Sequence, residues 1–323
     1  MTHDRLSLWR AQPPSVAVEF TSTRVSAARV EIRAGQAVVS AHATEALPAG
    51  ALTPSLTSEN LQEPEVVRET LDRVLTRVGR PRRVGLVLPD AVAKVSVIRF
   101  EQVPARGADL DQLIKWQVRK AAPFAIEEAQ VSYLAGTREE HGHNFIVTLA
   151  RREVIKAYEG LCAAAGAHAG LVDISTFNVI NAVLAGAQPP SADWLLVNVT
   201  PDYASIAILR GSYPIFFRSR AASADETLSD LVHQTAMYYE DRLQGTGFGE
   251  VLLSGSFAAG GGLASELEAM RRSLESRLTA TVSTVDPRAA AKFADRAAVV
   301  APDLLDTLTP LVGLLVRHRG AAA

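Results

Sequence analysis

The glycine-rich segment Gly255–Gly262 is a candidate phosphate-binding loop. It follows a strand-like run, Glu250–Ser254, and glycine lets backbone N–H groups approach phosphate oxygens closely. A plain flexible turn explains the same glycines and is the interpretation we favour for Gly260 to Gly262. Ser254 and Ser256 have no ordered His and Asp partners nearby in the sequence, so hydrolase chemistry has no positive support.

Three other candidates have simple structural explanations. His141 and His143 supply at most two ligands, whereas zinc usually takes at least three from the protein. Cys162 lies on the apolar face of an expected helix and is interpreted as core. The run from Arg80 to Arg83 could bind phosphate or lipid headgroups, but a solvated turn before a strand is the favoured interpretation.

Composition excludes several classes of protein. The 323 residues are 48% hydrophobic, enough for a sizeable core, and the length favours two lobes. A net charge of −2 argues against a nucleic-acid-binding protein. The single cysteine fits a reducing compartment. No run approaches the roughly 20 apolar residues of a membrane span and no apolar leader is visible, so we expect a cytoplasmic protein.

The order of expected elements repeats. In each half, three strand-like runs with a tight turn between the last two precede an amphipathic helix. The second copy follows the linker-like residues 188–191. Two related α/β lobes around a cleft would give this order. The strand-like runs are Ser15–Phe20, Val25–Ile32 and Gln36–Ala43, then Leu195–Val199, Ala204–Leu209 and Tyr213–Arg218.

Short motifs along nearly the whole chain occur in a specific order, although none is decisive alone. The clearest are Leu113–Gln117 and Ala122–Glu128, followed by Ala150–Val154 and Gly170–Asp173. In this order they resemble the PilM family of type IV pilus assembly proteins. The resemblance implies an α/β fold with two actin-like (RNase H-type) lobes around a cleft. It places the first lobe at 1–187, an inserted subdomain at about 86–165, and the second lobe at 188–323, with a C-terminal helix returning to the first lobe.

The resemblance also implies two strand turns that grip nucleotide phosphates, and here both depart from the family pattern. Glu19 stands where an Asp is expected, Asn198 replaces the second carboxylate, and Pro201 has no N–H to donate. Only about 30 residues separate Arg218 from Glu250, so the outer subdomain of the second lobe should be reduced or missing. We therefore expect no cofactor and no catalysis.

If a nucleotide is bound at all, four small residues near the expected turns are its candidate contacts. These residues are Ser22, Thr23, Gly255 and Ser256. They support the alternative function, an ATP-binding and Mg²⁺-binding actin-like switch with the same assembly role. A sugar kinase of the same superfold is less favoured, because no catalytic Asp is evident.

The favoured function is a cytoplasmic scaffold of a type IV pilus or a related secretion machine. The resemblance implies that it binds the cytoplasmic tail of an inner-membrane PilN-like protein and reaches the membrane only indirectly, through that partner. The tail would occupy a groove between the first lobe and the insert. The expected contact residues are Val87, Val95, Trp116 and Phe124. The identity of the machine and any self-association remain open.

Overall fold

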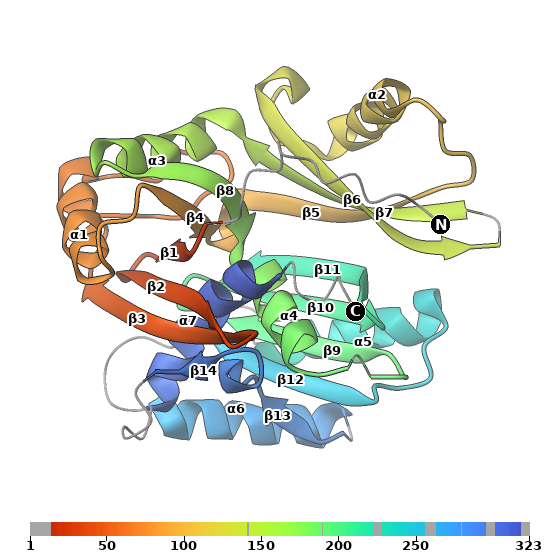
Figure 1. Cartoon of the computed structure of the whole chain (residues 1–323). Helices are drawn as coiled ribbons and strands as arrows, with labels where there is room; N and C mark the ends of the chain where they lie inside the picture. Colours follow the sequence, from red (N-terminus) through yellow and green to blue (C-terminus); the bar gives the residue numbers. More distant parts are fainter. Residues whose placement is uncertain are drawn as a thin grey trace.

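The computed structural model describes residues 14–140, 142–188, 190–222, 228–255, 263–278, 280–294 and 301–317. Two mixed β-sheets, each covered by helices, form two lobes, and a smaller three-stranded sheet projects from the first lobe (Figure 1).

The first lobe is built on the strand order β14-β3-β2-β1-β4-β8. Its first three strands form an antiparallel meander, and β4 and β8 then run parallel to β1. The strands are β1 Val16–Phe20, β2 Arg24–Arg33, β3 Gln36–Ala46, β4 Arg83–Leu88, β8 His168–Ile174 and β14 Lys292–Phe293.

The second lobe repeats this plan in the order β11-β10-β9-β12-β13. Again a meander of three antiparallel strands comes first, and two strands parallel to its first strand follow. The duplicated topology confirms the predicted pair of related α/β lobes. Its strands are β9 Trp194–Val199, β10 Tyr203–Arg210, β11 Tyr213–Ala221, β12 Glu250–Gly255 and β13 Val282–Thr284.

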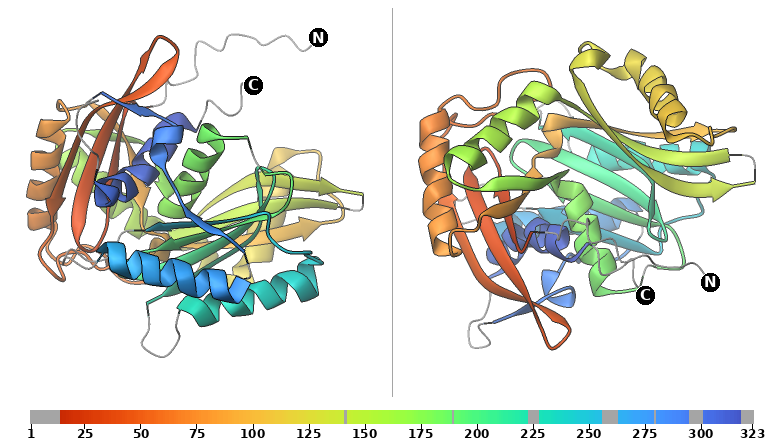
Figure 2. Two further views of the ribbon diagram at one scale, coloured as in Figure 1. Left: turned by 90° about the horizontal axis from the view of Figure 1, so that it is seen from below. Right: turned by 45° about the horizontal axis from the view of Figure 1, so that its top comes forward.

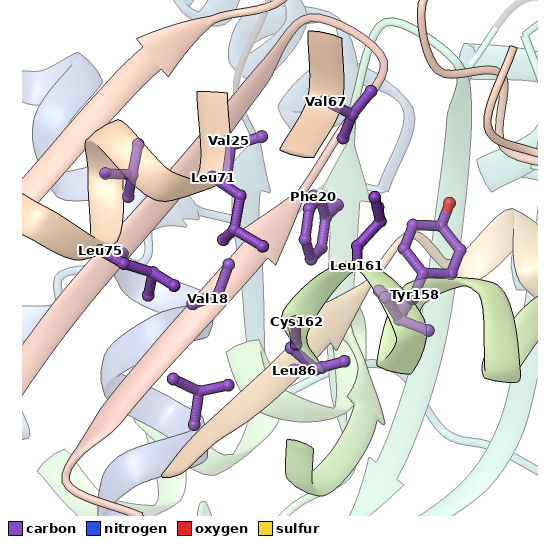
Figure 3. Close-up of a cluster of buried hydrophobic side chains, with 14 of the residues drawn as sticks. Val18, Phe20, Val25, Val67, Leu71, Leu75, Leu86, Tyr158, Leu161 and Cys162 are labelled. Atoms are coloured by element: carbon purple, nitrogen blue, oxygen red, sulfur yellow. The ribbon is translucent and has the colours of Figure 1, made fainter. Parts of the chain in front are cut away.

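Two amphipathic helices cover one face of the first sheet. Helix α1 (Pro64–Arg77) and helix α3 (Arg152–Ala164) pack there against side chains of β1, β2 and β4 (Figure 3). Phe20 and Tyr158 lie with ring centroids 5.4 Å apart at the centre of this cluster. Cys162 is fully buried beside them, which confirms its interpretation as a core residue.

Helix α7 (Pro302–Val316) crosses from the second lobe onto the other face of the first sheet. It packs there beside helix α4 (Ser175–Gly186). The two helices meet at Gly313, where an added Cβ would lie 1.7 Å from the carbonyl oxygen of Asn178. This glycine therefore permits the close crossing that ties the end of the described chain to the first lobe.

Helices α5 (Leu228–Leu243) and α6 (Leu263–Leu278) lie side by side on the outer face of the second sheet (Figure 2). Between β11 and β12, the described residues form α5 and no separate sheet.

The insert is a sheet in the order β5-β7-β6, covered on one face by helix α2 (Gly107–Val118). Its strands are β5 Ala93–Phe100, β6 Ala129–Glu139 and β7 Gly142–Arg151, so the separate sheet spans residues 93–151. The expected boundaries of 86–165 begin inside β4 and include α3. The apolar face of α3 packs on α1 and the first sheet, which places this helix with the first lobe. On its other face, the insert sheet lies against β11 of the second lobe.

Candidate functional site

The cleft between the lobes lies where strands β1 and β9 end. Only a small cavity remains there, of about 20 Å³, which is room for about one water molecule. Both lobes and α7 contribute to its walls. The lining residues are Glu19, Thr21, Arg24, Ser175, Val179, Asn198, Thr200, Pro201, Ser254, Gly255, Asp306 and Pro310.

Side chains of the protein bridge the cleft directly. Ser22 Oγ, after β1, donates a hydrogen bond to Asp202 Oδ2, after β9, at 2.6 Å. Deeper in the cleft, Asn198 Nδ2 donates to Thr176 Oγ1 at 2.8 Å. The two turns that the resemblance assigns to phosphate binding are therefore joined to each other by the Ser22–Asp202 hydrogen bond, and Asn198 at the second turn is bound to helix α4.

Glu19 lies at the base of the first turn and is almost completely buried. It accepts a hydrogen bond from Ser175 Oγ at 3.3 Å and pairs with Arg24 at 3.5 Å. Burial raises the pKa of Glu19 to about 7, and the Arg24 charge and the Ser175 hydroxyl offset part of that rise. A carboxyl with this pKa holds its proton much of the time near neutral pH and is a poor organiser of a metal's hydration shell.

Gly255 closes the opposite side of the cavity. Its φ of +152° suits glycine, and an added Cβ would lie 2.1 Å from the carbonyl oxygen of Val199. Asp306 on α7 lines the same cavity, and burial raises the pKa of its carboxyl group to about 7, a rise that the nearby Gly255 backbone opposes.

Asp90, in the short 3-10 turn between β4 and β5, ties the start of the insert to helix α4. Its buried carboxylate accepts hydrogen bonds from the backbone N–H of Thr176, at 3.0 Å, and from the Thr176 hydroxyl. It therefore caps the first turn of α4, where a negative charge is favourable. Burial raises the pKa of Asp90, and the hydrogen bonds oppose that rise.

The sequence-predicted nucleotide contacts fall at this cleft only in part. Ser22 and Thr23 form the turn after β1, and Gly255 ends β12. Ser256 and the remaining glycines of its loop lie outside the described residues. Three residues of the site, Asp90, Asp202 and Asp306, were not predicted from the sequence. The available signals were acidic residues directly after strand-like runs and one acid within the apolar stretch around Leu311.

The four predicted partner contacts are not brought together. Val87, on β4, is fully buried against α7, so a bound peptide could not touch its side chain and this residue cannot belong to a surface groove. Phe124 is half-buried against the insert core beneath α2. Val95 is half-buried on β5, and Trp116 on α2 is 67% exposed.

Within the described ranges, no cluster of three or more His, Cys, Asp or Glu side chains is arranged to hold a metal ion. His141 lies outside those ranges. Among the helices that the structure describes, none is both long and apolar enough to cross a membrane.

The sequence matches a known protein family. The family described as type IV pilus assembly protein PilM matches residues 17–244, which is most of the sequence. This chain belongs to the PilM family. No curated protein matches the sequence.

Solved structures agree on the fold. A PilM-PilN type IV pilus biogenesis complex contains a chain that superposes with a TM-score of 0.78 at 17% identity, covering 97% of this chain and 100% of that one. A Bacteroides thetaiotaomicron protein with an actin-like ATPase fold and unknown function gives a TM-score of 0.51 at 9% identity, covering 84% and 91%. The PilM-family chain described here therefore has the actin-like fold.

Proposed function

We propose that this PilM-family protein is a non-enzymatic assembly scaffold whose nucleotide cleft is closed by its own side chains. The observation that carries the proposal is the cavity of about 20 Å³ bridged by the Ser22–Asp202 hydrogen bond. A nucleotide pocket is usually several hundred Å³. Binding ATP here would require the two lobes to separate and these contacts to break.

The charge of the cleft opposes a triphosphate as well. Carboxyl groups of Glu19, Asp202 and Asp306 lie at or beside the cavity, and Arg24 is the cation that lines it. An anionic ligand would meet more negative than positive groups at short range. Asn198 supplies an amide where the family pattern has a carboxylate, and its Nδ2 is engaged with Thr176.

We further propose that the partner is the cytoplasmic tail of a PilN-like inner-membrane protein, and that this partner holds the chain at the cytoplasmic face of the membrane. The family match and the fold shared with the PilM-PilN complex support this part of the proposal. The insert is the natural docking element, because β5 and β6 are both edge strands of its sheet. An edge strand can pair with an extended peptide through main-chain hydrogen bonds.

The test is a titration of a fluorescent peptide, copied from the cytoplasmic tail of a PilN-like protein of the same organism, into the purified protein. Saturable binding should weaken at least tenfold in Val95→Glu and in Phe124→Asp. Tyr238→Ser on α5, an exposed aromatic residue of the second lobe, is the matched control and should bind normally. The proposal fails if the peptide does not bind, or if the Tyr238 variant loses as much affinity as the insert variants.

The alternative is an ATP-binding switch with the same assembly role. Melting temperatures measured with and without Mg-ATP distinguish it from the scaffold. A ligand that binds only the native state raises its melting temperature. A saturable rise with Mg-ATP would favour the switch, whereas an unchanged melting temperature agrees with the closed cleft.

A further inference from the structure

Helix α2 carries an exposed tryptophan on its outer face. The inner face of the helix packs Ile114 and Val118 against the insert sheet. Trp116 points away from that contact and is 67% exposed, together with Leu134 the most exposed of the large hydrophobic side chains described. Folding of this chain alone does not account for its position, because exposing an indole leaves a large apolar surface in water.

Three cations surround this indole. Lys115 precedes Trp116, and Arg119 and Lys120 follow three and four residues later, which is neighbouring spacing on a helical surface. All three are exposed, and none forms an ion pair with another described residue. The acidic residues of α2, Asp109 and Asp111, lie toward the other end of the helix, and Asp111 accepts a hydrogen bond from Tyr133 at 2.5 Å.

The shape of this surface limits what can cover it. Lys115 and Trp116 lie on the outer side of α2, and Arg119 and Lys120 lie in the 3-10 turn that continues it. The cavity beside α2 lies on its inner side, lined by Val118 and Val147. A peptide usually needs a groove or a strand edge to bury its side chains. In Figure 1 the insert sheet lies between α2 and the second lobe, so a flat surface could approach α2 without meeting the described part of the second lobe.

We propose that this surface, formed by Lys115, Trp116, Arg119 and Lys120, contacts a membrane directly through anionic lipid headgroups. An indole suits the interface between headgroups and acyl chains, because it has an apolar body and a polar N–H. Lysine and arginine near an anionic leaflet each contribute about 1 kcal/mol, or about fivefold in binding. The contact is weak, peripheral and salt-sensitive, and it adds to the attachment that a partner tail supplies.

The experiment is co-flotation of the full-length protein with lipid vesicles and no partner. Vesicles of phosphatidylcholine are compared with vesicles that also contain phosphatidylglycerol, at low and at high salt. The protein should float with the anionic vesicles at low salt, and screening at high salt should release it. The charge-reversal variant K115E/R119E/K120E should bind at least a hundredfold more weakly.

The matched control reverses the same number of charges elsewhere. Lys156, Arg242 and Lys292 are exposed on three other elements, so K156E/R242E/K292E changes the net charge equally and should retain binding. Melting temperatures of both variants establish that they are folded. Equal loss of binding in the two variants would show that net charge alone drives the association and would overturn the proposed surface.

A second readout follows the indole itself. Trp194 is fully buried and its N–H donates to the Gly211 carbonyl at 2.9 Å, so it is shielded from lipid. In a Trp9→Phe background, lipids brominated near the headgroup should quench the fluorescence of Trp116. Absence of quenching in W9F, or equal quenching in W9F/W116F, would contradict the proposal. Failure of wild-type protein to bind anionic vesicles would overturn it outright, whatever the result with the partner peptide.

Discussion

The substitution Glu19→Gln tests the electrostatics of the closed cleft. Burial raises the pKa of Glu19 to about 7, from 4.5 for an exposed glutamate. Between these pH values the unfolded chain releases a proton that the folded protein retains. The stability contributed by this group is therefore complete below the unfolded pKa and is lost as pH rises through about 7. At 1.36 kcal/mol per pH unit, the loss amounts to about 3 kcal/mol.

Glutamine has nearly the same shape and cannot ionise. We therefore expect Glu19→Gln to match the wild type near pH 5 and to be more stable by about 3 kcal/mol near pH 8. The lost attraction to Arg24 is already included, because that charge is one of the groups that set the pKa of about 7.

Urea denaturation of both proteins across this pH range measures the difference. Glu59→Gln, on the surface, controls for the loss of one negative charge. If the variant is less stable than the wild type at high pH, or if the difference does not depend on pH, the pKa of Glu19 is not raised in the folded protein. Glu19 would then be an ionised, well-paired carboxylate, as a metal-supporting residue would be.

Two other predictions concern the contacts that hold the lobes together. Gly313→Ala should destabilise the protein by more than about 2 kcal/mol, because the new Cβ would overlap the carbonyl oxygen of Asn178. The control is Gly160→Ala, in α3 with open space around it, which should stabilise the protein by up to about 1 kcal/mol. Thermal melts compare the two variants. Ser22→Ala should lower the free energy of unfolding by about 1 kcal/mol, because it removes the hydrogen bond to Asp202. It should also speed amide hydrogen exchange in the turns at residues 21–24 and 200–203. Unchanged exchange in both turns would show that this hydrogen bond does not hold the cleft closed.

Local patterns predicted the lobes well. The alternating strands and the tight turns at Gly35 and Gly211 define each meander without any long-range information. The repetition of the meander then indicates two lobes, because such a sheet needs its own helices to cover it.

The boundaries of the insert could not be predicted in the same way. The amphipathic face of α3 fits either sheet, and only the tertiary structure shows that Tyr158 packs against Phe20 of the first lobe. Val87 was a different case, since β4 is an uninterrupted apolar run, which is typical of a parallel strand buried on both faces. That pattern already argued against Val87 as a surface contact.

The closed cleft depends on pairs that are distant in sequence. Ser22 and Asp202 are 180 residues apart, and no local periodicity connects them. Asp306 is one of two acidic residues in the otherwise apolar helix α7, and it lines the same cavity as Gly255 only because α7 crosses between the lobes. The sequence indicated that the family's metal-supporting carboxylates had changed, but the side chains that now bridge the gap emerge only from the fold.

If the cleft of this PilM-family protein is closed by its own side chains, it should hold no nucleotide. The decisive measurement is calorimetric titration of the purified, folded protein with Mg-ATP. We expect no heat beyond that of dilution, and no phosphate release on long incubation. Saturable binding in the micromolar range would overturn the proposed scaffold function and identify the chain as an ATP-binding switch.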